Sequence, residues 1–435
     1  MSEATVRCTN HPLPPADKLR SSSRAGDTAM RPRIGRRRIV VLMEGSGASF
    51  DSAPSNVTRT LESIALGPTS KDDFEQWAIW DHGVGTRLRN IDDKEIERAF
   101  KGIDRRYLKV LPPPQRPPLV LASLAKIAGL TFGAGLAANV TEAVEALVCL
   151  YEPLDELFLL GFSRGAFTVR VLAALLWRFG LPQPGTDVRR WVHQRLAEMR
   201  REPTFDPTQR FPVQTHFLGL WDTVKSYGFI RPVRFFHLRH NPGVFNVRHA
   251  LALDEKRSSF QCTTWGGLDR DLNQRDGRRP CSPRAWKPEP NAQQTVKEVW
   301  FRGCHSDIGG GSRERQNAEI TLRWMLLEAR DCGLVLKTEG DAFVASPDPG
   351  RPITPTESWN WWWRRADRVP RWEISNDFSP ARLHFAWHHT GSRQPGEMLR
   401  GGTVAFHATS GVRIDGSTGA LTSKITAPRV GAEHR

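Results

Sequence analysis

"LFLLGFSRGAFTVRVLAALL", residues 157–176, joins an unbroken apolar run to a segment with helical periodicity through a turn that holds one serine. The run from Leu157 to Phe162 has the length and apolar character of a β-strand buried on both faces. After the turn, apolar residues recur at helical spacing, at Val169, Leu172, Ala173 and Leu176. The stretch therefore predicts a buried strand, a sharp turn and a helix.

Two glycines, Gly161 and Gly165, flank Ser163 in the pattern Gly-x-Ser-x-Gly, which is typical of a nucleophile elbow. Because glycine has no Cβ, these positions allow a strained turn that lifts the serine hydroxyl clear of the backbone. The pentapeptide alone is a weak signal, but the strand before it and the helix after it favour a catalytic serine. The alternative is structural, with Ser163 only capping the following helix.

Strands and helices alternate along the rest of the chain. Strands that run into loops are predicted at Ile39–Met43, Trp77–Thr86 and Gln214–Leu220 and in "VKEVWFRGCHSDIGGG", and helices at residues 139–151, residues 187–201, Val247–Glu255 and Asn317–Arg330. This alternation predicts the α/β class, with a mostly parallel sheet and helices on both of its faces.

The carboxyl ends of such strands are where reactive groups gather. Asp222 ends the strand in "THFLGLWDT" and His305 follows the strand in "EVWFRGCHSD", which gives the chain order serine, aspartate, histidine found in α/β hydrolases. In such a triad His305 takes the proton of Ser163, and Asp222 fixes the imidazole tautomer.

Other assignments of these residues stay open. Asp222 is alternatively a loop acid that binds backbone amides, and His305 a packed loop histidine. The rival acids are Asp307 and Asp254, and the rival base is His249, which is expected to face inward on its predicted helix.

An acyl-transfer site also needs N–H donors for the developing oxyanion. The backbone amide of Arg164, directly after the serine, is one expected donor. A second is expected from Gly45, Ser46 or Gly47 in "MEGSGAS"; the alternative is a phosphate-binding nest, although no Gly-Lys-Ser/Thr follows. The side chain of Arg164 is expected either to pair with Asp51 or Asp81, which is favoured, or to bind a lipid phosphate.

Composition limits the partners. The 435 residues hold 62 Lys and Arg against 47 Asp and Glu, a formal charge of +15 that favours anionic partners. Residues 1–36 are Arg-rich and are predicted to form a disordered tail. No apolar stretch near the start resembles the hydrophobic region of a secretory signal, so synthesis in the cytoplasm is expected. The apolar stretch Leu119–Val140 is broken by Lys126 and by glycines, which disfavours a membrane span.

Metal and cofactor sites are not predicted. The six cysteines form no CxxC pair, so their spacing indicates neither a zinc site nor a disulfide framework, and reduced thiols are expected. Asp81, His82 and Asp307 lack the spacing of metal ligands as well.

Six blocks of the chain, taken together, resemble the family called domain of unknown function 2235. They are "LMEGSGASFDSAPSNVTRTL", "WDHGVGT", "LFLLGFSRGAFTVRVLA", "FLGLWDTV", "HALALDE" and "VWFRGCHSDIGGG" with the helix after it. That family includes the catalytic domain of type VI secretion phospholipase effectors. The resemblance implies an α/β-hydrolase-like fold and hydrolysis of phospholipid acyl esters by a triad that matches Ser163, Asp222 and His305. Members usually carry Asp-Gly-Thr-Gly where this chain has a glutamate, Glu44, before Gly45, Ser46 and Gly47.

The resemblance covers about residues 37–330, so we expect a catalytic domain at residues 37–335. Residues 336–435 are expected to form a less regular C-terminal appendage, in which "SWNWWWRRADRVPRW" sets tryptophans among arginines. This stretch is expected either to pack on the hydrolase core, which is favoured, or to lie at a membrane interface.

The sequence supports two alternative functions. The first is a serine hydrolase, a lipase or phospholipase of lipid degradation, with a phospholipid membrane surface as its substrate and no nucleic-acid partner. For this first function, the resemblance also implies a role as an antibacterial effector of type VI secretion, with secretion-apparatus and immunity proteins as partners. The second is a catalytically silent basic module on a hydrolase scaffold, which binds membrane or nucleic acid.

Overall fold

The structure is a computed structural model. It describes residues 36–45, 53–69, 74–81, 104–111, 130–183, 185–200, 213–224, 238, 241, 243–257, 260, 262–265, 294–311, 315–346, 355–357, 371–374, 383–386 and 405–406. The predicted tail and most of the Trp/Arg-rich stretch therefore lie outside the described residues, and those two predictions stay untested.

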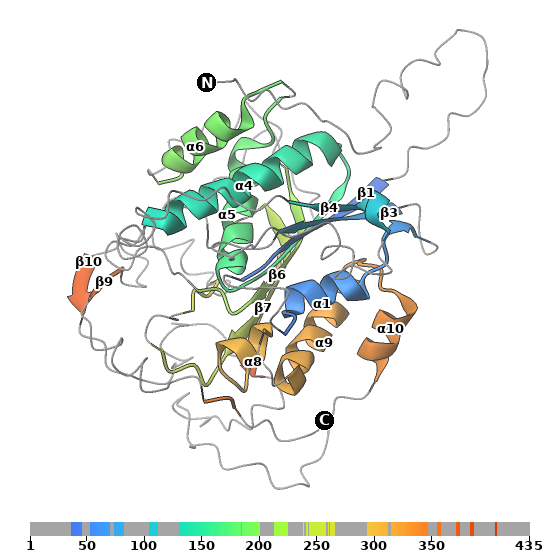
Figure 1. The fold of residues 1–435 in the computed structure, drawn as a ribbon, viewed down its shortest axis with the longest axis vertical. Helices are drawn as coiled ribbons and strands as arrows, with labels where there is room; N and C mark the ends of the chain where they lie inside the picture. The colour runs from blue at the N-terminus through green and yellow to red at the C-terminus, as the bar shows by residue number, and fades with distance from the viewer. Residues whose placement is uncertain are drawn as a thin grey trace, which may run out of the picture.

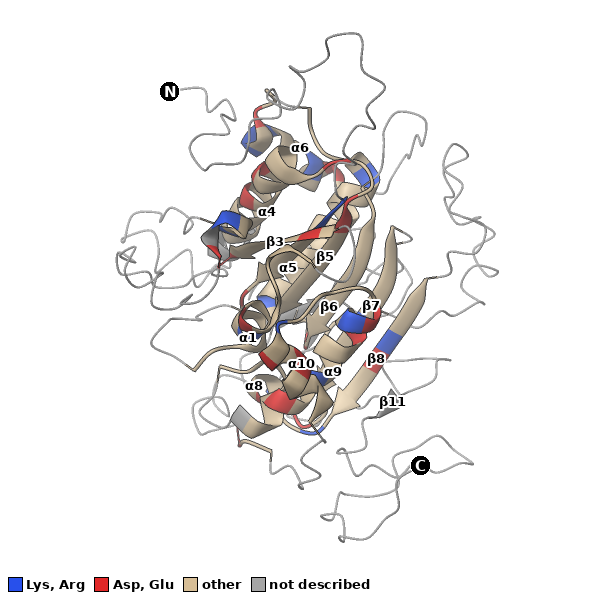
Figure 2. Ribbon diagram, turned by 90° about the vertical axis from the view of Figure 1, so that its right-hand side faces the viewer, with Lys and Arg blue, Asp and Glu red and all other residues tan. Residues whose placement is uncertain are grey.

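A mostly parallel sheet forms the centre of the described chain. Its strands lie in the order β11-β8-β7-β6-β5-β1-β3-β2, with β4 also paired to β3, and only β2 runs antiparallel to its neighbour. The strands are β1 (Arg36–Met43), β2 (Gly67–Pro68), β3 (Phe74–Asp81), β4 (Leu108–Val110), β5 (Glu156–Phe162), β6 (Thr215–Trp221), β7 (Val244–Ala252), β8 (Thr295–Phe301) and β11 (Ala405–Phe406). Figure 2 shows β3, β5, β6, β7 and β8 following one another across the sheet.

Helices cover both faces of this sheet, as predicted. On one side lie α4 (Leu130–Leu150), α5 (Arg164–Phe179) and α6 (Val188–Glu198), and on the other α1 (Asn56–Ser63), α9 (Arg315–Asp331) and α10 (Thr338–Ala345) (Figure 1). A short helix, α8 (His305–Gly309), follows β8. Residues Arg105–Tyr107 form a 3-10 turn, and β9 (Arg371–Ile374) pairs with β10 (Leu383–Ala386) in a separate antiparallel ribbon.

The two faces explain why the central strands are continuously apolar. In β5, Leu157 and Leu159 pack with α4 and α5, whereas Phe158 and Leu160 belong to the cluster formed with α1 and α9. Successive side chains of a strand point to opposite faces, so a strand covered on both sides has no polar alternation. The buried strand predicted from Leu157 to Phe162 is confirmed.

One predicted element is wrong. The segment Val247–Glu255 is not a helix: residues Val244–Ala252 form β7, which pairs with β6 on one side and β8 on the other. Its apolar residues fit a helical period, but the strand is buried between two helical layers. A strand in that position is apolar on both faces, and periodicity alone does not distinguish it from a buried helix.

The chain order of the sheet reverses between β1 and β5. From β1 the chain builds outward through β3, and from β5 it builds the other way through β6, β7 and β8. In sheets of this kind ligands bind at the carboxyl ends of the strands, at the point where the order reverses. Here that point lies between the residues after Met43 and the serine turn after Phe162.

Two further sequence expectations concern membranes and cysteines. Among the helices in the described ranges, none is both long and apolar enough to cross a bilayer. Cys262, Cys304 and Cys332 are free thiols. Cys149 is disulfide-bonded, so the expectation of reduced thiols is wrong at this position.

Elements beyond residue 335 contact the same domain. Val344 of α10 lies in the core cluster with α1 and α9, and β11 extends the sheet beyond β8. The boundary at residue 335 therefore stays a prediction.

Candidate active site

The turn after β5 has the strained backbone of a nucleophile elbow. Ser163 adopts φ 57° and ψ −118°, in a region that residues with a side chain rarely occupy. The flanking glycines permit it, since a Cβ at Gly165 would lie 2.2 Å from the Met43 carbonyl oxygen and one at Gly161 would lie 2.6 Å from the Gly165 carbonyl carbon. The elbow thus packs α5 against the ends of both β1 and β5.

The hydroxyl of Ser163 does not cap α5. No hydrogen bond runs from this side chain to the first turn of the helix. Instead the oxygen lies 2.8 Å from Nε2 of His305. Capping of α5 by the Ser163 hydroxyl, the structural alternative, is therefore not observed.

Asp222 lies beside the elbow because of strand register. Trp221 at the end of β6 pairs with Phe162 at the end of β5, so the next residue of each strand emerges at the same level. Asp222 is fully buried and adopts φ 39°. Its Oδ2 lies 2.6 Å from Nδ1 of His305, while its Oδ1 accepts a hydrogen bond from the Ala252 amide at 3.0 Å.

His305 begins α8 and is enclosed on both sides. Its imidazole packs on the rings of Phe162 and Phe260, with centroids 4.6 and 4.9 Å away. This burial lowers the pKa of His305, although the neighbouring Asp222 carboxylate opposes the shift. A neutral ring with its proton on Nδ1 donates to Asp222 and leaves the Nε2 lone pair facing Ser163, as a general base requires.

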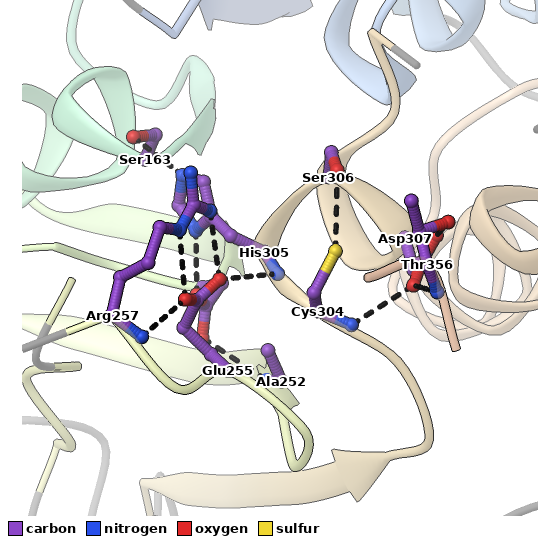
Figure 3. A network of polar contacts seen from close by, with 10 residues as sticks. Ser163, Ala252, Glu255, Arg257, Cys304, His305, Ser306, Asp307 and Thr356 are labelled. Atoms are coloured by element: carbon purple, nitrogen blue, oxygen red, sulfur yellow. Dashed lines mark hydrogen bonds and ion pairs between the residues drawn. The ribbon is translucent and has the colours of Figure 1, made fainter. Parts of the chain in front are cut away.

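A buried ion pair between Glu255 and Arg257 supports the backbone of His305. Glu255 accepts a hydrogen bond from the backbone N–H of His305 at 3.1 Å and binds Arg257 through two bonds of 2.8 Å, as Figure 3 shows. The Arg257 guanidinium in turn lies 3.7 Å above the ring of Phe260. Burial acts to raise the pKa of Glu255, but the hydrogen bonds and the positive charge of Arg257 together lower it below the ordinary value.

These supporting residues were missed by the sequence analysis. Glu255 ends the block "HALALDE", which is a sequence signal that could have pointed to this residue. Neither Arg257 nor Phe260 belongs to a motif or a periodic pattern, so contact with His305 identifies them only in three dimensions.

The rival acids and the rival base have other partners. Asp307 accepts bonds from the Cys304 amide and from Thr356, and Asp254 pairs with Arg302 and accepts from the Gly303 amide. His249 lies on β7, where Nδ1 contacts Glu298 at 2.9 Å and Nε2 accepts from the Thr223 amide at 3.2 Å. Thus His249 supports the backbone directly after Asp222.

The expected oxyanion loop is partly described. Gly45 lies against the elbow: a Cβ there would be 2.9 Å from the Phe162 ring and 3.4 Å from Cβ of Ser163. Arg164 is half-buried and opens α5, so its amide belongs to the first turn, where N–H groups lack intrahelical acceptors. Ser46 lies outside the described residues, as do Gly47, His82 and Asp51, one of the two expected partners of Arg164.

Glu44, where relatives usually carry aspartate, is a buried structural group. Its carboxylate accepts hydrogen bonds from the hydroxyls of Ser55 and Thr58 at the start of α1. Burial raises its pKa, while these bonds oppose the shift. The Glu44 side chain therefore ties the end of β1 to the start of α1.

Other acidic groups nearby do not form a metal site. Asp81, the other expected partner of Arg164, accepts a hydrogen bond from the amide of Asn139. In the described part of the chain, no group of three or more His, Cys, Asp and Glu side chains is placed to hold a metal ion.

Comparison with known proteins places the chain in a family. A family model for the T6SS phospholipase effector Tle1-like catalytic domain matches residues 37–328. An uncharacterized protein of Saccharomyces cerevisiae is 25% identical over 264 residues, which are 56% of this chain and 35% of the yeast protein.

Two solved structures are similar at low identity. An uncharacterized protein from Pseudomonas aeruginosa matches with a TM-score of 0.35 and 16% identity, over 73% of this chain and 50% of that one. A Tle1 effector bound to the VgrG spike of the type VI secretion system matches with a TM-score of 0.33 and 17% identity, over 64% and 51%. This chain thus spans about a third of the yeast relative and about half of each solved chain. With a match over most of its length and an α/β-hydrolase-like fold, the chain belongs to the family of T6SS Tle1-like phospholipase effector catalytic domains.

Proposed function

We propose that this chain is a serine hydrolase that cleaves carboxylic esters of phospholipids. The observation that carries the proposal is the unbroken chain of contacts from Ser163 through His305 to Asp222, at 2.8 and 2.6 Å. Proton transfer needs heavy atoms within about 2.6–3.2 Å, and both contacts meet this requirement. Membership of the family supports phospholipid as the substrate class.

The first half of the reaction acylates the serine. As the Ser163 oxygen attacks the ester carbonyl carbon, its proton passes to Nε2 of His305, and Asp222 stabilises the resulting imidazolium. The tetrahedral intermediate collapses when its bond to the lysophospholipid oxygen breaks. His305 returns the proton to that oxygen, which leaves an acyl ester on Ser163 and a neutral imidazole.

The second half hydrolyses the acyl ester. Water attacks the same carbonyl carbon, gives its proton to His305, and the serine oxygen departs with that proton, which releases a fatty acid. Both tetrahedral intermediates carry a negative oxygen that needs donors. The amides of Arg164 and of the loop beginning at Gly45 are the proposed donors, supported by the contact of Gly45 with the elbow.

Export and partners are proposed from the family alone. A T6SS effector is carried by the secretion apparatus, so we infer that this chain leaves the cell by that route. A spike protein of the kind bound in the solved Tle1 complex and a protective immunity protein are the partners to test. The membrane surface, rather than a protein, would then present the substrate.

The test compares wild type with Ser163→Ala on phospholipid vesicles and with a fluorophosphonate probe. Wild type is expected to release fatty acid and to become labelled, and Ser163→Ala to do neither. The matched control is Ser63→Ala, which removes a hydroxyl whose hydrogen bond in the described part of the chain lies within α1, to the carbonyl of Arg59 at 2.7 Å. Full fatty-acid release by Ser163→Ala would contradict the proposal.

The formal charge of +15 favours a second candidate, a basic module without turnover that binds membrane or nucleic acid. The same samples distinguish it. Salt-sensitive binding to anionic vesicles or to DNA, without fatty-acid release and without labelling of Ser163, would favour this candidate.

A further inference from the structure

Helix α8, which begins with His305, is anchored by the Asp307 carboxylate, which also binds a residue distant in the sequence, Thr356. Asp307 is fully buried, and its Oδ2 accepts hydrogen bonds of 2.9 Å from the amides of both Cys304 and Thr356. Its Oδ1 accepts a bond of 2.7 Å from the Thr356 hydroxyl. Figure 3 shows Thr356 beside Asp307, across Cys304 from Ser163 and His305.

Thr356 comes from outside the matched family domain. That domain ends at residue 328, and Thr356 lies in the described segment 355–357, within the expected C-terminal appendage. The next residue, Glu357, pairs with Lys256 at 3.2 Å, in the loop that also carries Glu255. The segment 355–357 therefore contacts both pieces of chain that hold His305.

The two backbone amides at the start of the histidine helix are each held by a buried carboxylate. Asp307 holds the N–H of Cys304, and Glu255 holds the N–H of His305. Both oxygens of Asp307 are engaged, so its carboxylate has a fixed orientation. The chain is also packed tightly against it, since a Cβ at Gly303 would lie 2.5 Å from Cβ of Asp307.

Loss of the Thr356 hydroxyl would remove the described partner of Oδ1 at a fully buried carboxyl group. A buried polar oxygen that loses a hydrogen bond turns or draws in water. Either response loosens the hydrogen bond that the Cys304 amide donates to Asp307. The direction in which the His305 side chain leaves the backbone would then change. A displacement of about 1 Å at the reacting groups can cost on the order of 100-fold in rate, so a smaller shift is expected to be measurable.

We propose that Thr356 is a positioning residue for His305, acting through Asp307. The active site of this chain then includes a residue supplied by the segment beyond its family domain. The proposal rests on the function proposed above only in its catalytic consequence, because the alignment of the imidazole is a structural property.

The catalytic test compares Thr356→Val, which keeps shape and loses the hydroxyl, with Thr356→Ser, which keeps the hydroxyl. Thr356→Val is expected to lower kcat for a p-nitrophenyl ester on the order of tenfold with little change in KM, and Thr356→Ser to stay within about twofold of wild type. The matched control, Thr141→Val, removes a buried threonine hydroxyl that donates to the Ala137 carbonyl within α4 at 2.7 Å, and it is expected to match wild type. Equal losses in the serine variant or in the control would overturn the proposal, since neither removes the Thr356 hydroxyl.

A second measurement does not depend on turnover. The proton that His305 shares with Asp222 should give a downfield proton resonance, assigned by its loss in Asp222→Asn. In Thr356→Val this resonance is expected to shift or broaden, and in Thr356→Ser to stay in place. An unchanged resonance and an unchanged kcat in Thr356→Val would overturn the proposal.

The two measurements separate the possible failures. If Thr356→Val does not fold, as judged by circular dichroism, Thr356→Ala takes its place under the same criteria. A wild-type protein that shows the resonance but hydrolyses no ester would contradict the proposed function. The role of Thr356 would then be decided by the resonance alone.

Discussion

Ser163 and His305 lie 2.8 Å apart, but the chain holds them in different ways. Ser163 is fixed by its own strand, turn and helix, packed through glycines onto the neighbouring β1. His305 is held by residues distant in sequence: Glu255 is 50 positions away and Asp222 is 83, while Thr356 lies 49 positions from the Asp307 that it binds.

This difference predicts how substitutions around Ser163 and around His305 affect the protein. The serine side depends on backbone contacts with no room to adjust, so one added methyl group should damage folding itself. The histidine side is held by several hydrogen bonds and ring contacts, so the loss of one should lower activity by a limited amount and leave the fold intact. The following variants test that contrast.

The largest effect on folding is expected from Gly165→Ala. A Cβ at this position would lie 2.2 Å from the carbonyl oxygen of Met43 and 2.5 Å from that of Glu44, so backbone would have to move. We expect a loss of about 3 kcal/mol or more in the free energy of unfolding, measured by urea denaturation. The control is Gly219→Ala, whose Cβ would contact the side chains of Leu160 and Met325 at 3.0 Å, which can shift. Equal stability of the two variants would contradict a rigid elbow.

Asp222→Asn should leave the fold unchanged and remove most activity. Asparagine tolerates the positive φ of 39° at this position, so the backbone is expected to be preserved. Because Oδ1 accepts from the Ala252 amide, the asparagine NH2 group would face Nδ1 of His305 and donate to it, which fixes the imidazole in the wrong tautomer. We expect kcat to fall on the order of 10⁴-fold at unchanged thermal stability. A fall below tenfold would mean that Asp222 is only a backbone-binding loop acid.

Glu255→Gln should have an intermediate effect. The amide oxygen can still accept from the His305 N–H, but the ion pair with Arg257 is lost. We expect kcat to fall roughly tenfold, with some loss of stability because the arginine keeps a partly buried charge. The control is Glu328→Gln on α9, which also removes a carboxylate from an arginine pair, in this case with Arg248. A similar loss of activity in both variants would show that general destabilisation, rather than support of His305, is responsible.

The smallest effect is a shift in the pH profile. Burial lowers the pKa of His305 below the ordinary imidazole value of 6.5, so the base stays neutral and active to lower pH. The acidic limb of kcat/KM is therefore expected to have its midpoint below pH 6.5. Glu255 acts to raise this pKa, so Glu255→Gln should move the limb further down. A wild-type midpoint at or above 6.5 would contradict the enclosed histidine.

The same contrast explains what could be predicted from the sequence. The elbow was predictable because its strand, glycines and helix are contiguous and carry their own periodic and turn signals. Asp222 and His305 could be placed because each follows a strand, and parallel strands end at one edge of the sheet. The positions of all three were predicted, and their catalytic roles remain a proposal.

The rest could not be read from local patterns. β7 was assigned as a helix because its apolar residues fit both periods when a strand is buried on two faces. Phe260 and Thr356 support the histidine through contacts that leave no spacing or motif in the sequence. A residue of this kind becomes visible only once the chain is folded.

The short strand β11 has a practical consequence for work with shortened forms of the protein. It lies in parallel beside Val299 and Trp300 of β8 and so covers part of that strand's outer edge. A fragment trimmed to the family domain would present those backbone groups to solvent, and an uncovered strand edge invites pairing with other molecules. Such a fragment should precipitate more readily than the full chain, so a failure to purify it in active form would say little about its chemistry.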